Sequence, residues 1–143
     1  MTLDSQRRGI GAITFRLDAT SGLTPYLQLT QQVTHALRLG QLKVGDRLPT
    51  IRDVAGRLAI NPNTVLKAYR HLEMQGLLAS RPGAGVFVAK ELRGPSPQDQ
   101  AAVRRLLMRW LTQAREAGFD TDGMQALFAD ALRQHAVDEV VAS

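Results

Sequence analysis

One stretch of the 143-residue chain decides its fold, and it reads Asn61-Pro62-Asn63-Thr64-Val65-Leu66-Lys67-Ala68-Tyr69-Arg70-His71-Leu72-Glu73-Met74-Gln75-Gly76. The stretch predicts one helix with both ends marked. Asn61 can cap the start, because its side-chain oxygen can accept from an unpaired N–H of the first turn, and proline suits the first helical position. Gly76 suits the left-handed residue that follows a helix. The apolar face comprises Val65, Ala68, Leu72 and, at its edge, Tyr69.

The opposite face of this helix is polar. It carries Asn63, Thr64, Lys67, Arg70 and His71. Short polar groups at a helix start, with cations further along, are typical of a helix that enters a DNA groove N-terminus first. A surface helix with a solvated polar face would show the same pattern, so the flanking sequence has to decide between them.

Two helices and a strand are predicted before this stretch. Thr24-Pro25 opens the first helix and Gly40 ends it, while Pro49-Thr50 starts a short second helix with Thr50 as its cap. A turn of a few residues separates the second helix from the one at Asn61, as in a helix-turn-helix. Within residues 10–17, apolar residues alternate with polar ones and predict a short half-buried strand, and residues 1–9 are expected to be disordered.

A hairpin is predicted after Gly76. Two short apolar runs flank the turn Pro82-Gly83-Ala84-Gly85. Three helices followed by a hairpin form a winged helix-turn-helix. Glycine lets the hairpin tip approach a phosphate backbone closely, and Arg81 supplies a cation there.

The tail predicts two more helices. Ser96 and Pro97 start the fourth, which ends at Gly118, and the fifth begins at Met124 after a link over residues 119–123. Their apolar stripes need a further surface, either the front domain or, as we favour, the same helices of a second subunit. The expected dimer contacts are Val103, Leu106, Leu107, Trp110, Leu111, Leu127, Phe128 and Leu132. The fold is therefore predicted to be mostly α with a small β component. A winged helix-turn-helix domain is expected over residues 10–90 and a helical dimerisation tail over residues 96–141.

Charge and composition restrict the classes of function that are open to the chain. Residues 1–90 carry 12 Lys/Arg against 5 Asp/Glu, a net charge of +7, whereas residues 91–143 carry 6 against 8, a net charge of −2. This asymmetry favours a front part that binds a polyanion. The chain has no cysteine, no catalytic motif and three isolated histidines, so we expect no metal site, no cofactor and no enzymatic activity. Without a signal peptide or an apolar run of about 18 residues, it is expected in the cytoplasm.

From Pro25 to Val88 the chain resembles the winged-helix domain of the GntR family of bacterial transcription regulators. The resemblance rests on Pro25-Tyr26-Leu27-Gln28, on residues 40–52 with Gly45-Asp46-Arg47-Leu48-Pro49-Thr50, on Asn61 to Tyr69, on Leu72 to Leu77, and on Gly83 to Val88. It departs from the family where Thr50 replaces a frequent serine and Val86 a frequent threonine. The strand before the first helix and the short two-helix tail are similar to the YtrA-like subfamily.

The resemblance implies a homodimeric, sequence-specific repressor of an inverted-repeat operator in double-stranded DNA, and members with such short tails often control transporter operons. It implies DNA contacts by Thr50, Arg52, Asn61, Asn63, Thr64, Lys67, Arg70, Arg81 and Gly83. Asn61 can instead serve only as a cap, and Arg52 can instead form a surface ion pair. Two other readings stay open: a winged-helix protein-interaction module without DNA binding, and a fragment of an aminotransferase-fused regulator, against which the two-helix ending argues.

Overall fold

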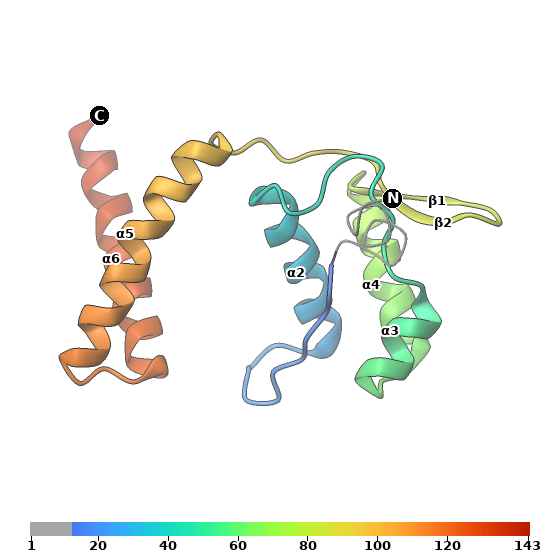
Figure 1. Ribbon diagram of the computed structural model, residues 1–143, viewed down its shortest axis with the longest axis horizontal. Coiled ribbons are helices and arrows are strands. Elements are labelled where there is room, and N and C mark those ends of the chain that lie inside the picture. Colours follow the sequence, from blue (N-terminus) through green and yellow to red (C-terminus); the bar gives the residue numbers. More distant parts are fainter. Residues whose placement is uncertain (1–12) are drawn as a thin grey trace, which may run out of the picture. The chain divides into compact units, whose positions relative to one another are not determined.

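The computed structural model describes residues 13–143 and divides into two compact units, which separate between Gly94 and Pro95. The first unit contains helices α2 (Pro25–Arg38), α3 (Ile51–Leu58) and α4 (Pro62–Met74) and strands β1 (Leu78–Arg81) and β2 (Gly85–Val88) (Figure 1). The second contains α5 (Pro97–Glu116) and α6 (Thr121–Ala142). The predicted fold class, mostly α with a small β component, is confirmed. The expected disorder of residues 1–9 lies outside the described residues.

The first three helices begin at the caps that the sequence predicts. The side chain of Thr24 accepts from the N–H of Leu27, that of Thr50 from Asp53 at 3.1 Å, and that of Asn61 from Asn63 at 2.8 Å. These bonds satisfy N–H groups that have no partner inside the helix. At the far ends of α2 and α4, Gly40 and Gly76 take positive φ angles of 69° and 77°, which glycine adopts without a steric cost.

The core of the first unit lies where α2, α3 and α4 meet. Its fully buried side chains include Leu29, Val33, Val65, Ala68 and Leu72. Tyr69 was predicted at the edge of the apolar face, but it is only 2% exposed. Its phenol can be buried because it donates a hydrogen bond to the carbonyl of Pro49 at 2.6 Å. Burial raises the pKa of the Tyr69 phenol above its ordinary value.

The hairpin is a two-stranded antiparallel sheet that is held on a third segment. Leu78 pairs with Val88 and Arg81 with Gly85. Along the other edge of β2, the residues before α3 add backbone hydrogen bonds from Leu48 N–H to the Val86 carbonyl and from Val88 N–H to the Asp46 carbonyl, both 2.8 Å. The base of the hairpin is therefore fixed to the chain that enters α3.

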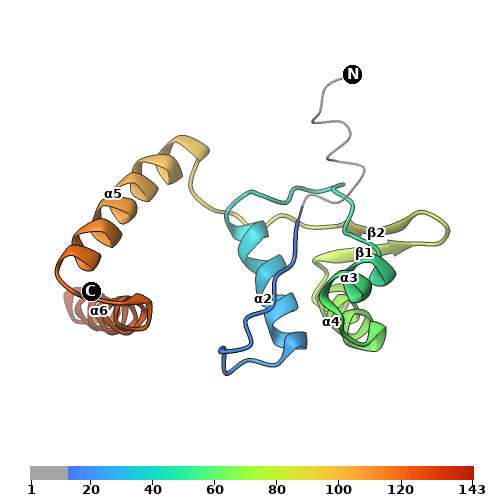
Figure 2. The ribbon, with the colours of Figure 1, turned by 60° about the horizontal axis from the view of Figure 1, so that its bottom comes forward.

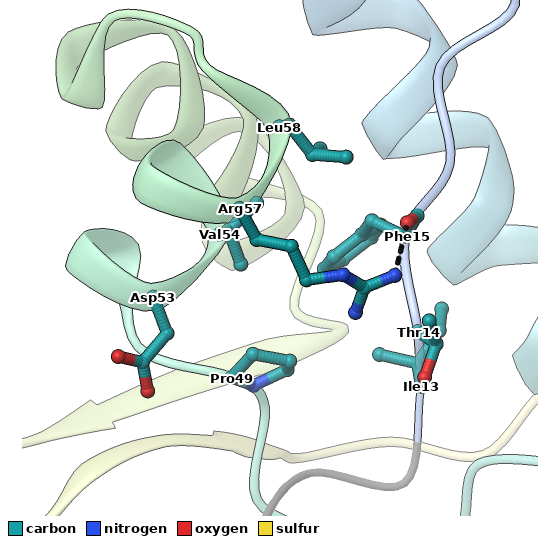
Figure 3. Close-up of a pocket in the computed structure, with 8 residues that line it drawn as sticks. All are labelled: Ile13, Thr14, Phe15, Pro49, Asp53, Val54, Arg57 and Leu58. Carbon is teal, nitrogen blue, oxygen red and sulfur yellow. Dashed lines mark hydrogen bonds between the residues drawn. The ribbon is translucent and has the colours of Figure 1, made fainter.

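The strand predicted within residues 10–17 does not form in the described part, which starts at residue 13. Its expected burial pattern is present, since Phe15 is buried while Thr14 and Arg16 are exposed. A strand also needs a partner, and a side chain takes that place: the Gln32 amide accepts from the Arg16 N–H at 3.0 Å and donates to the Arg16 carbonyl at 2.6 Å. Arg57 of α3 donates to the Phe15 carbonyl at 3.2 Å, beside a cavity of about 270 Å³ (Figure 3).

The second unit has almost no core of its own. Ala114 and Met124 are its buried apolar residues, and the rings of Trp110 and Phe128 lie 6.2 Å apart. Beyond the connecting loop, α5 and α6 diverge, as Figure 2 shows. The start of α6 corrects the predicted link: the Asp120 carboxylate accepts from the Gly123 N–H at 2.8 Å, so the helix begins at Thr121 rather than at Met124. No helix in residues 13–143 combines the length and apolar character needed to cross a bilayer.

Tyr69→Phe tests the buried hydrogen bond. Leaving the Pro49 carbonyl without its donor should lower the free energy of unfolding by about 1–3 kcal/mol. Because the pKa of folded Tyr69 is raised, the unfolded state loses its phenolic proton first, so this group's stabilisation is present below about pH 10 and is lost above it, by up to about 1.4 kcal/mol per pH unit. Urea unfolding at pH 8 and pH 11 measures both effects. The control Tyr26→Phe should lose as much unfolding free energy between pH 8 and pH 11 as the wild type. An equally large loss in Tyr69→Phe would contradict the assignment of this pH dependence to Tyr69.

Candidate nucleic-acid interface

One side of α4, here called the recognition face, carries the exposed residues Asn63, Lys67, Arg70 and Met74 and the half-buried Leu66. Each of the five lies three or four residues from at least one of the others, which places them on one side of a helix. The same five residues, with Tyr26 of α2 and His71, line one surface depression. Its lining contains cations and no carboxylate. Of the predicted DNA contacts, Asn63, Lys67 and Arg70 are brought together here.

Tyr26 is a part of this surface that the sequence did not reveal. The Lys67 ammonium lies over its ring, 4.7 Å from the centroid, and the His71 ring meets it edge-on at 5.8 Å. Lys67 and His71 are one helical turn apart, so both reach the same aromatic ring from α4. A cation over an exposed aromatic ring gains about 0.5–1 kcal/mol. Tyr26 therefore orients Lys67 on the recognition face, and only the packing of α2 on α4 could show it.

The predicted contacts of α3 lie at its start. Thr50 is exposed, and its hydroxyl oxygen accepts the capping hydrogen bond while the hydroxyl hydrogen stays free to donate. Arg52 is exposed as well, and among residues 13–143 the one salt bridge joins Arg133 to Asp130. The guanidinium of Arg52 is therefore not held in an ion pair within this part of the chain.

Asn61 and Thr64 belong to the first turn of α4 but not to the depression. The side-chain oxygen of Asn61 is occupied by the cap to Asn63, which leaves its NH₂ group as a donor. Thr64 is half-buried. Asn61 thus serves as the cap that the sequence allowed for.

Arg81 and Gly83 lie at the tip of the hairpin, which projects from the helices in Figure 1. The Arg81 guanidinium lies 4.7 Å from the centroid of the Phe87 ring, so an aromatic side chain holds this cation too. Gly83 has a φ of 75°, which supplies the turn. Both residues are exposed. They lie outside the recognition-face depression.

Comparison with known proteins gives a family match over most of the first unit. The family of bacterial regulatory proteins named gntR matches residues 25–88. The chain is 30% identical over 99 residues to the HTH-type transcriptional regulator YhcF of Bacillus subtilis, covering 69% of this chain and 82% of that protein. It is 29% identical over 108 residues to the HTH-type transcriptional repressor YtrA of Bacillus subtilis, covering 75% of this chain and 83% of that protein.

A solved structure is similar in fold. It is YtrA from Sulfolobus acidocaldarius, described as a GntR-family transcription factor, with 30% sequence identity and a TM-score of 0.50. The likeness covers 68% of this chain and 97% of that one. The related proteins are transcriptional regulators rather than enzymes.

The contact between Tyr26 and Lys67 can be tested without any ligand. A double-mutant cycle of Tyr26→Leu and Lys67→Met should give a coupling of about 0.5–1 kcal/mol in the free energy of unfolding. In NMR spectra, the Lys67 methylene protons should move downfield in Tyr26→Leu, because the ring current is removed, and should stay in place in Tyr26→Phe. Unchanged Lys67 shifts in Tyr26→Leu would show that the ammonium does not lie over the ring.

Proposed function

The chain belongs to the gntR family of bacterial regulatory proteins, and from that premise we propose that it is a homodimeric repressor of transcription that binds an inverted-repeat operator. The observation that carries the proposal is the recognition face. It presents Asn63, Lys67 and Arg70 on one side of a helix with no carboxylate in the depression that they line. A surface of cations and amide groups matches the phosphates and base edges of a DNA major groove.

The proposed roles follow from the chemistry of each side chain. Arg52 carries a planar guanidinium that can bind O6 and N7 of guanine together, and no ion pair within residues 13–143 holds it. Lys67 and Arg70 neutralise phosphates or reach bases, while Asn63 offers an amide to a base edge. The remaining proposed contacts are made to the sugar-phosphate backbone of the DNA, by Thr50, Asn61, Thr64, Arg81 and Gly83.

The second unit supports a dimer. Its apolar side chains are open to solvent, with Val103 63%, Leu106 58% and Leu132 58% exposed. Continuous apolar surface of this kind is rare on monomers and marks an interface. We propose that α5 and α6 of a second copy cover it. The proposed contacts are Val103, Leu106, Leu107, Trp110, Leu111, Leu127, Phe128 and Leu132.

A two-fold dimer imposes two-fold symmetry on its DNA, so the operator is an inverted repeat with half-sites about one helical turn apart. The name of the related YtrA as a repressor supports repression over activation. The protein then acts in the bacterial cytoplasm, where its DNA is, and needs no cofactor for this role. The resemblance to the YtrA-like subfamily supports control of a transporter operon.

Selection of bound duplexes from a random pool tests DNA binding. We expect an inverted repeat, and we expect Lys67→Ala to reduce the slope of log affinity against log salt by about one per subunit, because one phosphate contact is lost. Arg133→Ala is the matched control, since it removes one cation from the tail and should leave the slope unchanged. If no duplex is enriched, the alternative function is favoured, a winged-helix protein-interaction module without DNA binding. If a monomer protects one asymmetric site, the proposed inverted repeat is wrong.

Trp110→Ala tests the dimer. Truncating a packed tryptophan costs about 3–5 kcal/mol, which corresponds to a dissociation constant raised at least about a hundredfold. Sedimentation at micromolar concentration should show a dimer for wild type and a monomer for the variant. Met108 lies on α5 away from the apolar stripe, so Met108→Ala should remain a dimer. A monomeric wild type would remove the tail from the proposed interface.

A further inference from the structure

The recognition face contains two apolar side chains, Leu66 and Met74, among its polar ones. The polar members have partners in the proposed function, namely phosphates and the donors and acceptors of base edges. Leu66 and Met74 have none. In the major groove, one base alone presents an apolar group to a protein, and that group is the C5-methyl of thymine.

Position along α4 distinguishes the two side chains. Leu66 is the fifth residue of the helix, about 6 Å along the axis from Pro62, whereas Met74 is about 12 Å further on at the last residue. Recognition helices contact base edges with their N-terminal residues. Met74 is also 88% exposed, while Leu66 is only half-exposed and so has a more fixed position. Leu66 is therefore the residue placed to meet a base.

The neighbours of Leu66 leave its outer surface open to a base. At 100° per residue, Leu66 lies about 40° from Arg70 and about 60° from Asn63 on the helix circumference, so the three share one sector. Lys67 lies on the other side of Asn63, and its ammonium is held over the Tyr26 ring, away from that sector. A base contacted by Asn63 or Arg70 would have Leu66 beside it.

We propose that Leu66 is a specificity-determining residue that packs against the C5-methyl group of one thymine in each half-site. The inference rests on the proposed function, since it needs α4 to lie in the major groove. Removing one methyl group from this contact should weaken binding about fourfold per half-site, from the transfer free energy of a methylene-sized group. A symmetric operator with two such thymines should lose about fifteenfold.

Deoxyuridine provides the test, because it differs from thymidine only in lacking the C5-methyl group. An operator is selected with wild-type protein, and each thymine is then replaced by uracil in both half-sites at once, one position at a time. Fluorescence anisotropy measures binding of each duplex by wild type, Leu66→Ala, Leu66→Met and Met74→Ala. Thermal unfolding confirms that each variant is folded.

The expected result is one thymine position per half-site at which uracil weakens wild type about fifteenfold. Leu66→Ala should bind the thymine and uracil duplexes equally at that position. Leu66→Met, which keeps an apolar side chain, and the control Met74→Ala should both retain the preference. If no position shows a larger uracil effect in wild type than in Leu66→Ala, the inference is wrong while the proposed function stands. If wild type selects no duplex at all, both are wrong.

Discussion

The hydrogen bond from the Tyr69 phenol to the Pro49 carbonyl joins two helices that carry the proposed DNA contacts. Tyr69 belongs to α4, and Pro49 immediately precedes the cap of α3. The bond is buried, so its loss leaves a carbonyl without a donor and costs more than the loss of an exposed bond. It therefore fixes the first turn of α3, with Arg52, relative to the recognition face.

The segment that ends at Pro49 also holds the hairpin. Its backbone pairs with β2 through Asp46 and Leu48, immediately before the α3 cap. Gly85 has a φ of 118°, a backbone conformation that residues with a side chain rarely adopt, and an added Cβ there would lie 3.0 Å from Nε of Arg47. One short stretch of chain thus fixes α3, α4 and the hairpin relative to one another. A rigid arrangement of the three lets separate contacts add to binding without each losing conformational entropy.

The helices of the first unit could be predicted because their signals are local. Caps at Thr24, Thr50 and Asn61 and glycines after α2 and α4 act within one helical turn, and the apolar spacing shows which face is buried. The predictions failed where the local structure depends on residues far away in the sequence. Within the described residues 13–17, the strand predicted before α2 did not form, because the Gln32 side chain took the place of a partner strand. The role of Tyr26 was hidden because its ring meets α4 only in the folded unit.

Hydrogen–deuterium exchange on adding the selected duplex tests most directly whether the start of α3, the recognition face and the hairpin tip form one DNA-binding surface. Exchange should slow in three segments of the first unit, around Thr50–Asp53, Asn61–Arg70 and Arg81–Gly85. The amides of α5 and α6 should keep the exchange rates that they have in the free protein. Protection confined to α5 and α6, or protection of the hairpin without the first turns of α3 and α4, would contradict the account.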